Sequence, residues 1–309
     1  MTLGISTRWN TYRHKSGEAM IEEILSLGFK CVELGYDLTL DLVPGIIKKV
    51  NEKAVVVNSV HNFCPVPVGA PMGHPELFSL SSTDQRARKS AVLHTGRTIE
   101  FAAQVGAGCV IVHAGNIEMR NITRKLIALA EKDGLFSPAY EKLKLKLLTV
   151  REKKRAKHLD CLYSSLEELT PILQSNKTQL ALENLPSWES IPTEVEMEEI
   201  FKRFDSSAIG YWHDLGHGQV RQNLGFIGHI RWLKKLCPRL LGMHIHDVTT
   251  PAYDHLMPPH GSINFAHFKD FVKPDTVLVL EPTPGTPEQN ILDGVKIIRE
   301  AWGLGNDKL

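Results

Sequence analysis

Ionisable side chains of the kinds that bind metals stand at the ends of seven short apolar runs in this 309-residue sequence. Carboxylates and imidazoles beside buried apolar segments are unfavourable unless they are paired or bound to a cation. If the fold brings the ends of these runs together, a divalent metal is their natural common partner. The residues are Glu33, His61, His113, Glu183, Asp214, His244 and Glu281.

The apolar runs are short and rich in β-branched residues, and each is followed by a longer stretch with helical periodicity. This alternation is typical of βα units with a parallel sheet. It predicts an α/β fold, a (β/α)8 TIM barrel that spans residues 1–309 as a single domain, and in such a barrel all carboxyl ends of the strands meet at one mouth. The eight runs begin at Leu3, Cys31, Val55, Cys109, Gln179, Ile209, Leu240 and Thr276.

Long loops are expected after the third and fourth strands, where the connections cover residues 62–108 and 116–178. The first contains the segment CPVPVGAPMGHP, and a loop of that length in a barrel is expected to hang over the mouth. The second contains KLKLKLLTVREKKRAKH, whose cations alternate with leucines. We interpret it as the solvated face of a long helix rather than as a nucleic-acid patch.

The composition points away from several classes of partner. Lys and Arg (36) nearly balance Asp and Glu (35), so no global field attracts DNA, RNA or an anionic membrane. The five cysteines lack a CxxC spacing, which disfavours a disulfide framework and a thiolate zinc site. No apolar stretch approaches the roughly 18 residues of a membrane span. We expect a cytoplasmic protein, with a homo-oligomer left open.

Side-chain parity refines the expected metal site. Because alternate residues of a strand face opposite sides, Asp214 and His213 cannot both point into the barrel. We expect Asp214 to point inward and His213 outward against the helices. His246 shares the inward face with His244.

The sequences ALENL, HDLGH, HIHD and LEPTPG occur in an order that resembles the xylose-isomerase-like superfamily of sugar epimerases, inosose dehydratases and endonuclease IV. The resemblance implies one metal site made of Glu183, Asp214, His244 and Glu281. Three carboxylates with one imidazole suit Mn²⁺, Mg²⁺ or Co²⁺, and Zn²⁺ also accepts this set.

The same resemblance implies catalytic roles. In the ketose 3-epimerases of the superfamily, the glutamates that correspond to Glu183 and Glu281 exchange protons with the substrate carbon. The expected reaction is isomerisation or epimerisation of a small sugar, keto-sugar or keto-inositol through an enediolate, which needs a base and a cation on its oxygens. The expected substrate-binding residues are Glu189, His217, His246, His255 and Trp9.

Two questions stay open. His61 and His113, together with Glu183, match a second metal site of the endonuclease IV branch, but they could equally bind substrate with only one ion present. A third metal of that branch needs an Asp where this chain has Tyr253, which disfavours an endonuclease IV-like phosphodiester hydrolase. The second question is the reaction itself, because a lyase or dehydratase that acts on a keto-sugar or keto-inositol, or a barrel that binds sugar without catalysis, would also fit the motifs.

Overall fold

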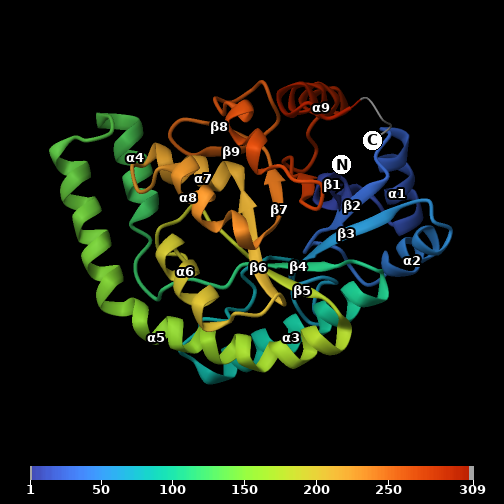
Figure 1. Ribbon diagram of the computed structural model, residues 1–309, viewed down its shortest axis with the longest axis horizontal. Coiled ribbons are helices and arrows are strands. Elements are labelled where there is room, and N and C mark those ends of the chain that lie inside the picture. Colours follow the sequence, from blue (N-terminus) through green and yellow to red (C-terminus); the bar gives the residue numbers. More distant parts are fainter. Residues whose placement is uncertain (1, 306–309) are drawn as a thin grey trace.

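Eight parallel strands close into a barrel in the computed structural model, which describes residues 2–305 (Figure 1). They follow chain order around the ring, and the last strand, β10, pairs with β1. Each predicted run forms one of these strands, so the predicted (β/α)8 fold is confirmed. The strands are β1 (Leu3–Ser6), β2 (Cys31–Leu34), β3 (Val56–His61), β4 (Cys109–Val112), β5 (Gln179–Glu183), β6 (Ile209–Asp214), β7 (Leu240–Ile245) and β10 (Val277–Leu280).

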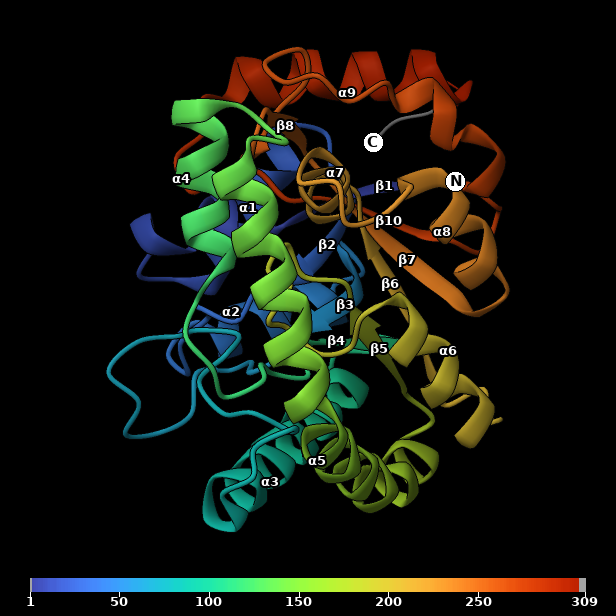
Figure 2. The same ribbon diagram turned by 90° about the vertical axis from the view of Figure 1, so that its left-hand side faces the viewer.

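Helices surround the barrel, and Figures 1 and 2 both show α9 at one side and α3 alongside α5 at the other. None of the helices in residues 2–305 is long and apolar enough to cross a membrane. The α-helices are α1 (Gly17–Ser26), α2 (Val43–Asn51), α3 (Gln85–Gln104), α4 (Thr123–Asp133), α5 (Pro138–Asn176), α6 (Glu194–Arg203), α7 (Leu215–Asn223), α8 (His229–Leu236) and α9 (Glu288–Trp302). Short 3-10 turns cover Thr7–Trp9, Thr11–Arg13, Cys237–Arg239 and Phe265–Phe271.

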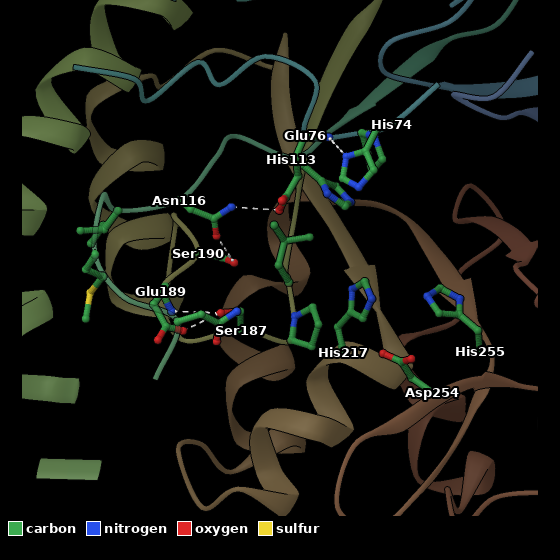
Figure 3. Close-up of a pocket in the computed structure, with 16 residues that line it drawn as sticks. His74, Glu76, His113, Asn116, Ser187, Glu189, Ser190, His217, Asp254 and His255 are labelled. Carbon is green, nitrogen blue, oxygen red and sulfur yellow. Dashed lines mark hydrogen bonds between the residues drawn. The ribbon is translucent and has the colours of Figure 1, made fainter. Parts of the chain in front are cut away.

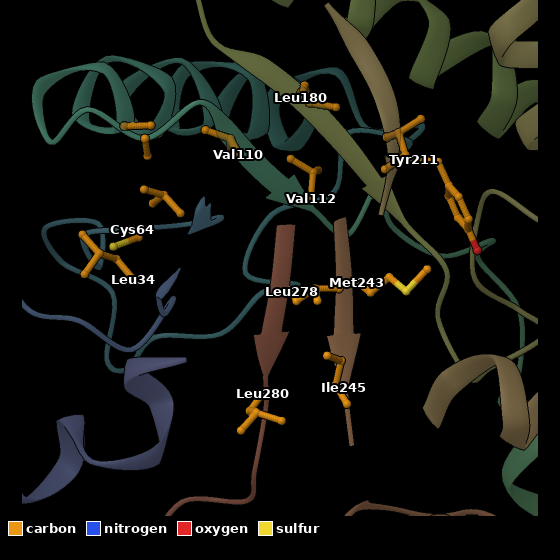
Figure 4. Packing of buried hydrophobic residues seen from close by; sticks show 14 of the residues in the cluster. Leu34, Cys64, Val110, Val112, Leu180, Tyr211, Met243, Ile245, Leu278 and Leu280 are labelled. Atoms are coloured by element: carbon orange, nitrogen blue, oxygen red, sulfur yellow. The ribbon is translucent and has the colours of Figure 1, made fainter. Parts of the chain in front are cut away.

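The main hydrophobic core lies between the outer faces of the strands and the helices. Figure 4 shows part of it, with Val110 on β4, Leu180 on β5 and Met243 on β7. A smaller cluster fills the barrel itself and is dominated by Trp212, which is completely buried. A Cβ atom on Gly242 would collide with the indole ring of Trp212, so this glycine makes room for the ring.

The two long connections differ in structure. The one after β3 is a loop followed by α3, and its residues His74 and Glu76 line a cavity at the mouth, as expected for a loop that hangs over it. The one after β4 is mostly helical and contains α4 and the 39-residue helix α5. On α5, Leu147 is buried and Leu145 is 67% exposed, so the basic segment is the partly solvated face of a long helix, as predicted.

An antiparallel hairpin directly after β7 is absent from the sequence prediction. It consists of β8 (Asp247–Thr249) and β9 (Tyr253–Leu256). The Asp247 carboxylate accepts hydrogen bonds from the backbone N–H groups of Val248, Gly261 and Ile263, which ties the hairpin to the segment that follows it. The hairpin turns the chain back so that the N–H of His255 donates to Nδ1 of His246.

The expected parity of β6 is confirmed. His213 points outward, where Nε2 lies 2.9 Å from Nε2 of His229 on α8 and Nδ1 lies 2.6 Å from the hydroxyl of Tyr211. Burial and the neighbouring His229 hold the pKa of His213 well below its usual range, and burial lowers the pKa of His229 to about 3. Both imidazoles are therefore neutral in the folded protein at neutral pH.

This buried pair predicts a loss of stability in mild acid. Below about pH 6.5 the unfolded chain takes up a proton on His229 that the folded chain does not, so the free energy of unfolding falls as the pH falls. From about pH 7.5 to about pH 5 this loss should be smaller by ~2 kcal/mol in His229→Gln than in the wild type, as measured by urea denaturation. The control is His267→Gln at the surface. Equal losses in wild type and His229→Gln would contradict the prediction.

Candidate metal centre

Four of the predicted ligands meet at the carboxyl ends of β5, β6, β7 and β10. Each of Glu183, Asp214, His244 and Glu281 places a ligand atom within 4.8 Å of those of the others. None of the four side chains is more than 4% exposed. Nδ1 of His244 lies 3.2 Å from Glu183, 3.4 Å from Glu281 and 3.7 Å from Asp214. The structure thus brings together all four residues that the resemblance assigned to one metal.

The electrostatics of this cluster favour a cation. Burial alone would raise the pKa of Glu183, but the charges of His113 and His244 hold it well below its usual range. The pKa of Glu281 is lowered to about 2, because His244, His255 and Arg8 outweigh its burial. The pKa of His244 is raised well above its usual value, because the carboxylates around it outweigh its burial. Without a metal, a proton on His244 supplies positive charge that a divalent ion can supply instead.

Glu183 joins this cluster to a second one, which contains His61 and His113. Its Oε1 faces His244, whereas its Oε2 lies 3.3 Å from Nε2 of His61 and 3.0 Å from Nε2 of His113. Nδ1 of His61 lies 3.0 Å from the carbonyl oxygen of Asn62 and must donate to it, which leaves Nε2 free of its proton in the neutral ring. The structure therefore brings together the three residues of the predicted second metal site, and the two oxygens of Glu183 face the two clusters.

Three further histidines, His217, His246 and His255, gather above Asp214. Nδ1 of His217 donates to the carbonyl oxygen of Asn184, and Nδ1 of His255 donates to that of Glu281, so Nε2 is the free nitrogen of both rings. His246 differs, because its Nδ1 accepts the N–H of His255 and its Nε2 donates to Asp214 at 3.0 Å. His246 is thus fully engaged as a partner of Asp214, while His217 and His255 offer a nitrogen each.

Two of the predicted substrate-binding residues have other contacts. Trp9 is completely buried in the main core, where its indole N–H donates to the carbonyl oxygen of Thr286, and it leaves no face on which a sugar ring could stack. Trp9 is also not among the residues that line the cavity at the mouth. Glu189 is buried and accepts hydrogen bonds from the N–H groups of Ile122 and Thr123 at the start of α4, and from the hydroxyls of Thr123 and Ser187. Its carboxylate fastens two loops of the mouth together.

A cavity of about 460 Å³ opens beside these clusters (Figure 3). His113, His217 and His255 lie along one side of it, with Asn116 and Glu189 across from them. Ile117, Met119, Leu185 and Pro186 add apolar surface. A concave site of this size with a few convergent polar groups beside a charged cluster is what a small ligand requires. The full lining is His74, Pro75, Glu76, His113, Asn116, Ile117, Met119, Asn121, Leu185, Pro186, Ser187, Glu189, Ser190, His217, Asp254 and His255.

Several residues of the site escaped the sequence prediction. His74 and Glu76 come from the loop after β3, and Asp254 comes from the β8–β9 hairpin. Arg8, just after β1, is different, because the sequence already suggests it as an anchor for a substrate anion. In the structure it donates to Glu281 at 3.2 Å and stacks on the ring of Tyr36. His74 and Glu76 could have been predicted from the sequence MGHPE, because this segment lies in the loop expected over the mouth. Asp254 could not, because the β8–β9 hairpin is too short to show a strand periodicity.

A model of the xylose isomerase-like TIM barrel family matches residues 21–301. The chain is also similar to the uncharacterized protein MJ1614 of Methanocaldococcus jannaschii, at 25% identity over 282 residues that cover 91% of this chain and 92% of that protein. Because the family model matches most of its length, the chain belongs to the xylose isomerase-like TIM barrel family.

Solved structures share the fold at lower identity. A D-tagatose 3-epimerase-like protein has a TM-score of 0.70 at 20% identity and covers 99% of both chains. The 3-keto-D-glucoside 4-epimerase YcjR of E. coli has a TM-score of 0.69 at 16% identity, with 97% of this chain and 99% of that chain covered. The IolI protein, solved with a zinc atom, has a TM-score of 0.67 at 15% identity and covers 98% of both chains.

The cluster predicts that a divalent cation stabilises the fold. At a free Mn²⁺ or Zn²⁺ concentration about 100 times the dissociation constant, the free energy of unfolding should rise by about 2.7 kcal/mol, and EDTA should remove this gain. Asp214→Asn keeps an oxygen that can cap α7 through the N–H of His217 but loses the ligand charge. At the same metal concentration, its gain should be at most about 1.4 kcal/mol, which corresponds to at least tenfold weaker binding. Chemical denaturation measures both values, and an undiminished gain in Asp214→Asn would refute this ligand assignment.

Proposed function

We propose that the protein is a divalent-metal-dependent isomerase or epimerase of a small sugar, keto-sugar or keto-inositol. The observation that carries the proposal is the convergence of Glu183, Asp214, His244 and Glu281 beside a cavity lined with histidines and amides. These residues would hold Mn²⁺, Mg²⁺, Co²⁺ or Zn²⁺, a set with hard oxygen donors that fits such ions. When bound, the ion supplies Lewis acidity toward carbonyl and hydroxyl oxygens.

Glu183 and Glu281 would move the proton. Removal of a proton α to a carbonyl requires an ionised base within hydrogen-bond reach, and both carboxylates are held ionised by their surroundings. To invert the carbon, the second carboxylate would first take up a proton from solvent and then donate it to the opposite face of the enediolate, while the proton removed from the substrate stays on the first carboxylate. Arg8 fixes one oxygen of Glu281 at 3.2 Å and thereby orients this group. The free Nε2 atoms of His217 and His255 would accept substrate hydroxyls.

The number of bound ions would decide whether Glu183 can act as the base. With one ion beside His244, the Oε2 atom of Glu183 faces only His61 and His113 and can accept a proton. With a second ion between these histidines, both oxygens of Glu183 would be ligands and the proton acceptor would be lost. We therefore favour one ion for the isomerase, with His113, and His61 in its protonated form, as hydrogen-bond donors to Glu183. Two ions would favour the phosphodiester hydrolase.

The substrate of the proposed reaction is uncharged. No Lys or Arg is among the residues that line the described cavity, whereas three carboxylates are, those of Glu76, Glu189 and Asp254. Phosphate recognition usually employs Arg, Lys or a helix N-terminus. Hydroxyl groups match the available donors and acceptors, which are the histidines, Asn116, Asn121 and Ser187.

Proton exchange tests the proposed reaction. The metal-loaded enzyme should incorporate deuterium from D₂O at the carbon α to the carbonyl of a ketohexose, a 3-keto-glucoside or a keto-inositol, as followed by NMR and mass spectrometry. Glu183→Gln and Glu281→Gln at saturating metal should lose on the order of 10²- to 10⁴-fold in rate, because each lacks a base. The control Glu118→Gln alters an exposed glutamate that takes no part in the cluster.

The outcomes of this experiment separate the candidate functions. A product lighter by one water, or one that has lost an aglycone, indicates a lyase that begins with the same proton removal. Cleavage of abasic duplex DNA without any exchange on the carbonyl panel indicates the hydrolase. Ligand binding without exchange or cleavage indicates a non-catalytic sugar-binding barrel.

The lining charges predict discrimination against phosphate esters. A ketohexose phosphate that places its phosphate in the cavity should bind the metal-loaded protein on the order of tenfold more weakly than the matching free ketohexose, because the carboxylates that line the cavity repel the phosphate. Glu76→Gln should reduce this ratio, whereas Glu118→Gln should leave it unchanged. Isothermal titration measures the affinities, and tighter binding of the phosphate ester would overturn the assignment of an uncharged substrate.

A further inference from the structure

Glu33 is a buried carboxylate that neither lines the cavity nor belongs to the ligand cluster. It lies near the end of β2, inside the barrel, and is completely buried. The hydroxyls of Ser6 and Ser59 donate to its two oxygens at 3.2 and 2.9 Å. Its other partner is Nε2 of His244, which lies 3.1 and 3.0 Å from the same two oxygens.

The two ring nitrogens of His244 face opposite groups. Nδ1 points at the cluster formed with Glu183, Asp214 and Glu281, and Nε2 points down at Glu33. A histidine ligand binds a metal through an unprotonated nitrogen and keeps its proton on the other nitrogen. A carboxylate can only accept, so the arrangement requires the proton on Nε2 and leaves Nδ1 for the metal.

The ring of His244 is also held in its plane. The indole of Trp212 meets it edge-on, with ring centroids 5.1 Å apart, and the ring of His61 stacks parallel to it at 5.9 Å. These two neighbours restrict rotation of the ring, so they fix its orientation. The remaining choice is which ring nitrogen carries the proton, and the carboxylate of Glu33 determines that choice.

We propose that Glu33 is a positioning residue, which holds His244 in the tautomer that presents Nδ1 to the divalent cation. The inference rests on the metal site of the proposed function. Carboxylates that accept the second N–H of a histidine ligand orient the ring and make it a better donor, and their loss typically weakens metal binding about 10- to 100-fold.

A comparison with Glu196 separates this role from an ordinary structural one. Glu196 is equally buried but forms a two-pronged ion pair with Arg151, at 2.6 and 2.7 Å. Glu33 has no such guanidinium among its hydrogen-bond and ion-pair partners in residues 2–305, and the positive charge nearest to it comes through His244. The negative charge of Glu33 is therefore compensated through His244, a residue of the candidate metal site, whereas that of Glu196 is compensated by Arg151.

The test compares Glu33→Gln with Glu196→Gln, which makes the same change at a buried glutamate outside the site. The dissociation constant of Mn²⁺ or Zn²⁺ is measured by competition with a chromophoric chelator, and circular dichroism checks the fold of each variant. We expect binding about 10- to 100-fold weaker in Glu33→Gln and unchanged in Glu196→Gln, because only Glu33 contacts a ligand.

Nitrogen-15 NMR of histidine-labelled, zinc-loaded wild type supplies a readout that a purely structural role would not move. The ring signals absent from His244→Gln identify His244, and we expect its proton on Nε2. A proton on Nδ1, or an unchanged dissociation constant in a folded Glu33→Gln, would overturn the positioning role. Failure of the wild type to bind either metal would overturn it together with the metal site.

The positioning role and the proposed reaction fail separately. Weaker metal binding in Glu33→Gln combined with absence of deuterium exchange in the wild type would support Glu33 and reject the isomerase. Unchanged metal binding in Glu33→Gln combined with deuterium exchange in the wild type would reject the positioning role of Glu33 and support the isomerase.

Discussion

The structure is organised around buried carboxylates whose cationic partners are histidines and an arginine, Arg8. The carboxylates of Glu33, Glu183 and Glu281 all contact the single imidazole of His244, and Asp214 lies just beyond hydrogen-bond distance. Ionised carboxylates inside a protein are unfavourable unless a cation or several donors face them. A divalent ion bound at Nδ1 of His244 would supply such a cation, and the proton on Nε2 of the same ring would then be donated to Glu33.

The barrel explains how one chain assembles such a cluster. Several parallel strands place polar side chains at or below the common mouth, and the pairing register sets the depth of each side chain in the barrel. Glu33 pairs with Ser59, two residues before His61, so Glu33 lies one layer deeper than the histidines of the mouth. Trp212 and the small residue Ala181 fill the interior beneath the site. The ligand shell and its support thus come from successive inward positions of the same strands.

Strand periodicity allowed the directions of several site side chains to be predicted from the sequence, whereas it gives no direction for side chains in loops. The inward directions of Asp214 and His244 could be predicted because parity and the common direction of the strands leave few choices. Trp9 and Glu189 lie just outside strands, where no period fixes their direction, and the one is buried in the core while the other caps a helix. Glu33 was recognised as a strand-end carboxylate, but only the register reveals that it faces His244 from below.

Trp212 fills the interior of the barrel below the candidate metal centre, so the barrel is open only at the carboxyl ends of its strands. Trp212 packs edge-on beneath His244, and Gly242 lets the indole fit tightly against its neighbouring strand. Water therefore approaches the carboxylates from the mouth, the side on which a substrate would sit. In an epimerase of the proposed kind, a seated substrate would separate Glu183 from bulk solvent, and a proton taken from the substrate would be trapped until release. In D₂O, deuterium would then appear in the product earlier than in the unreacted substrate. The deuterium contents of the two sugars would therefore show that one carboxylate removes the proton and that the other returns a different one.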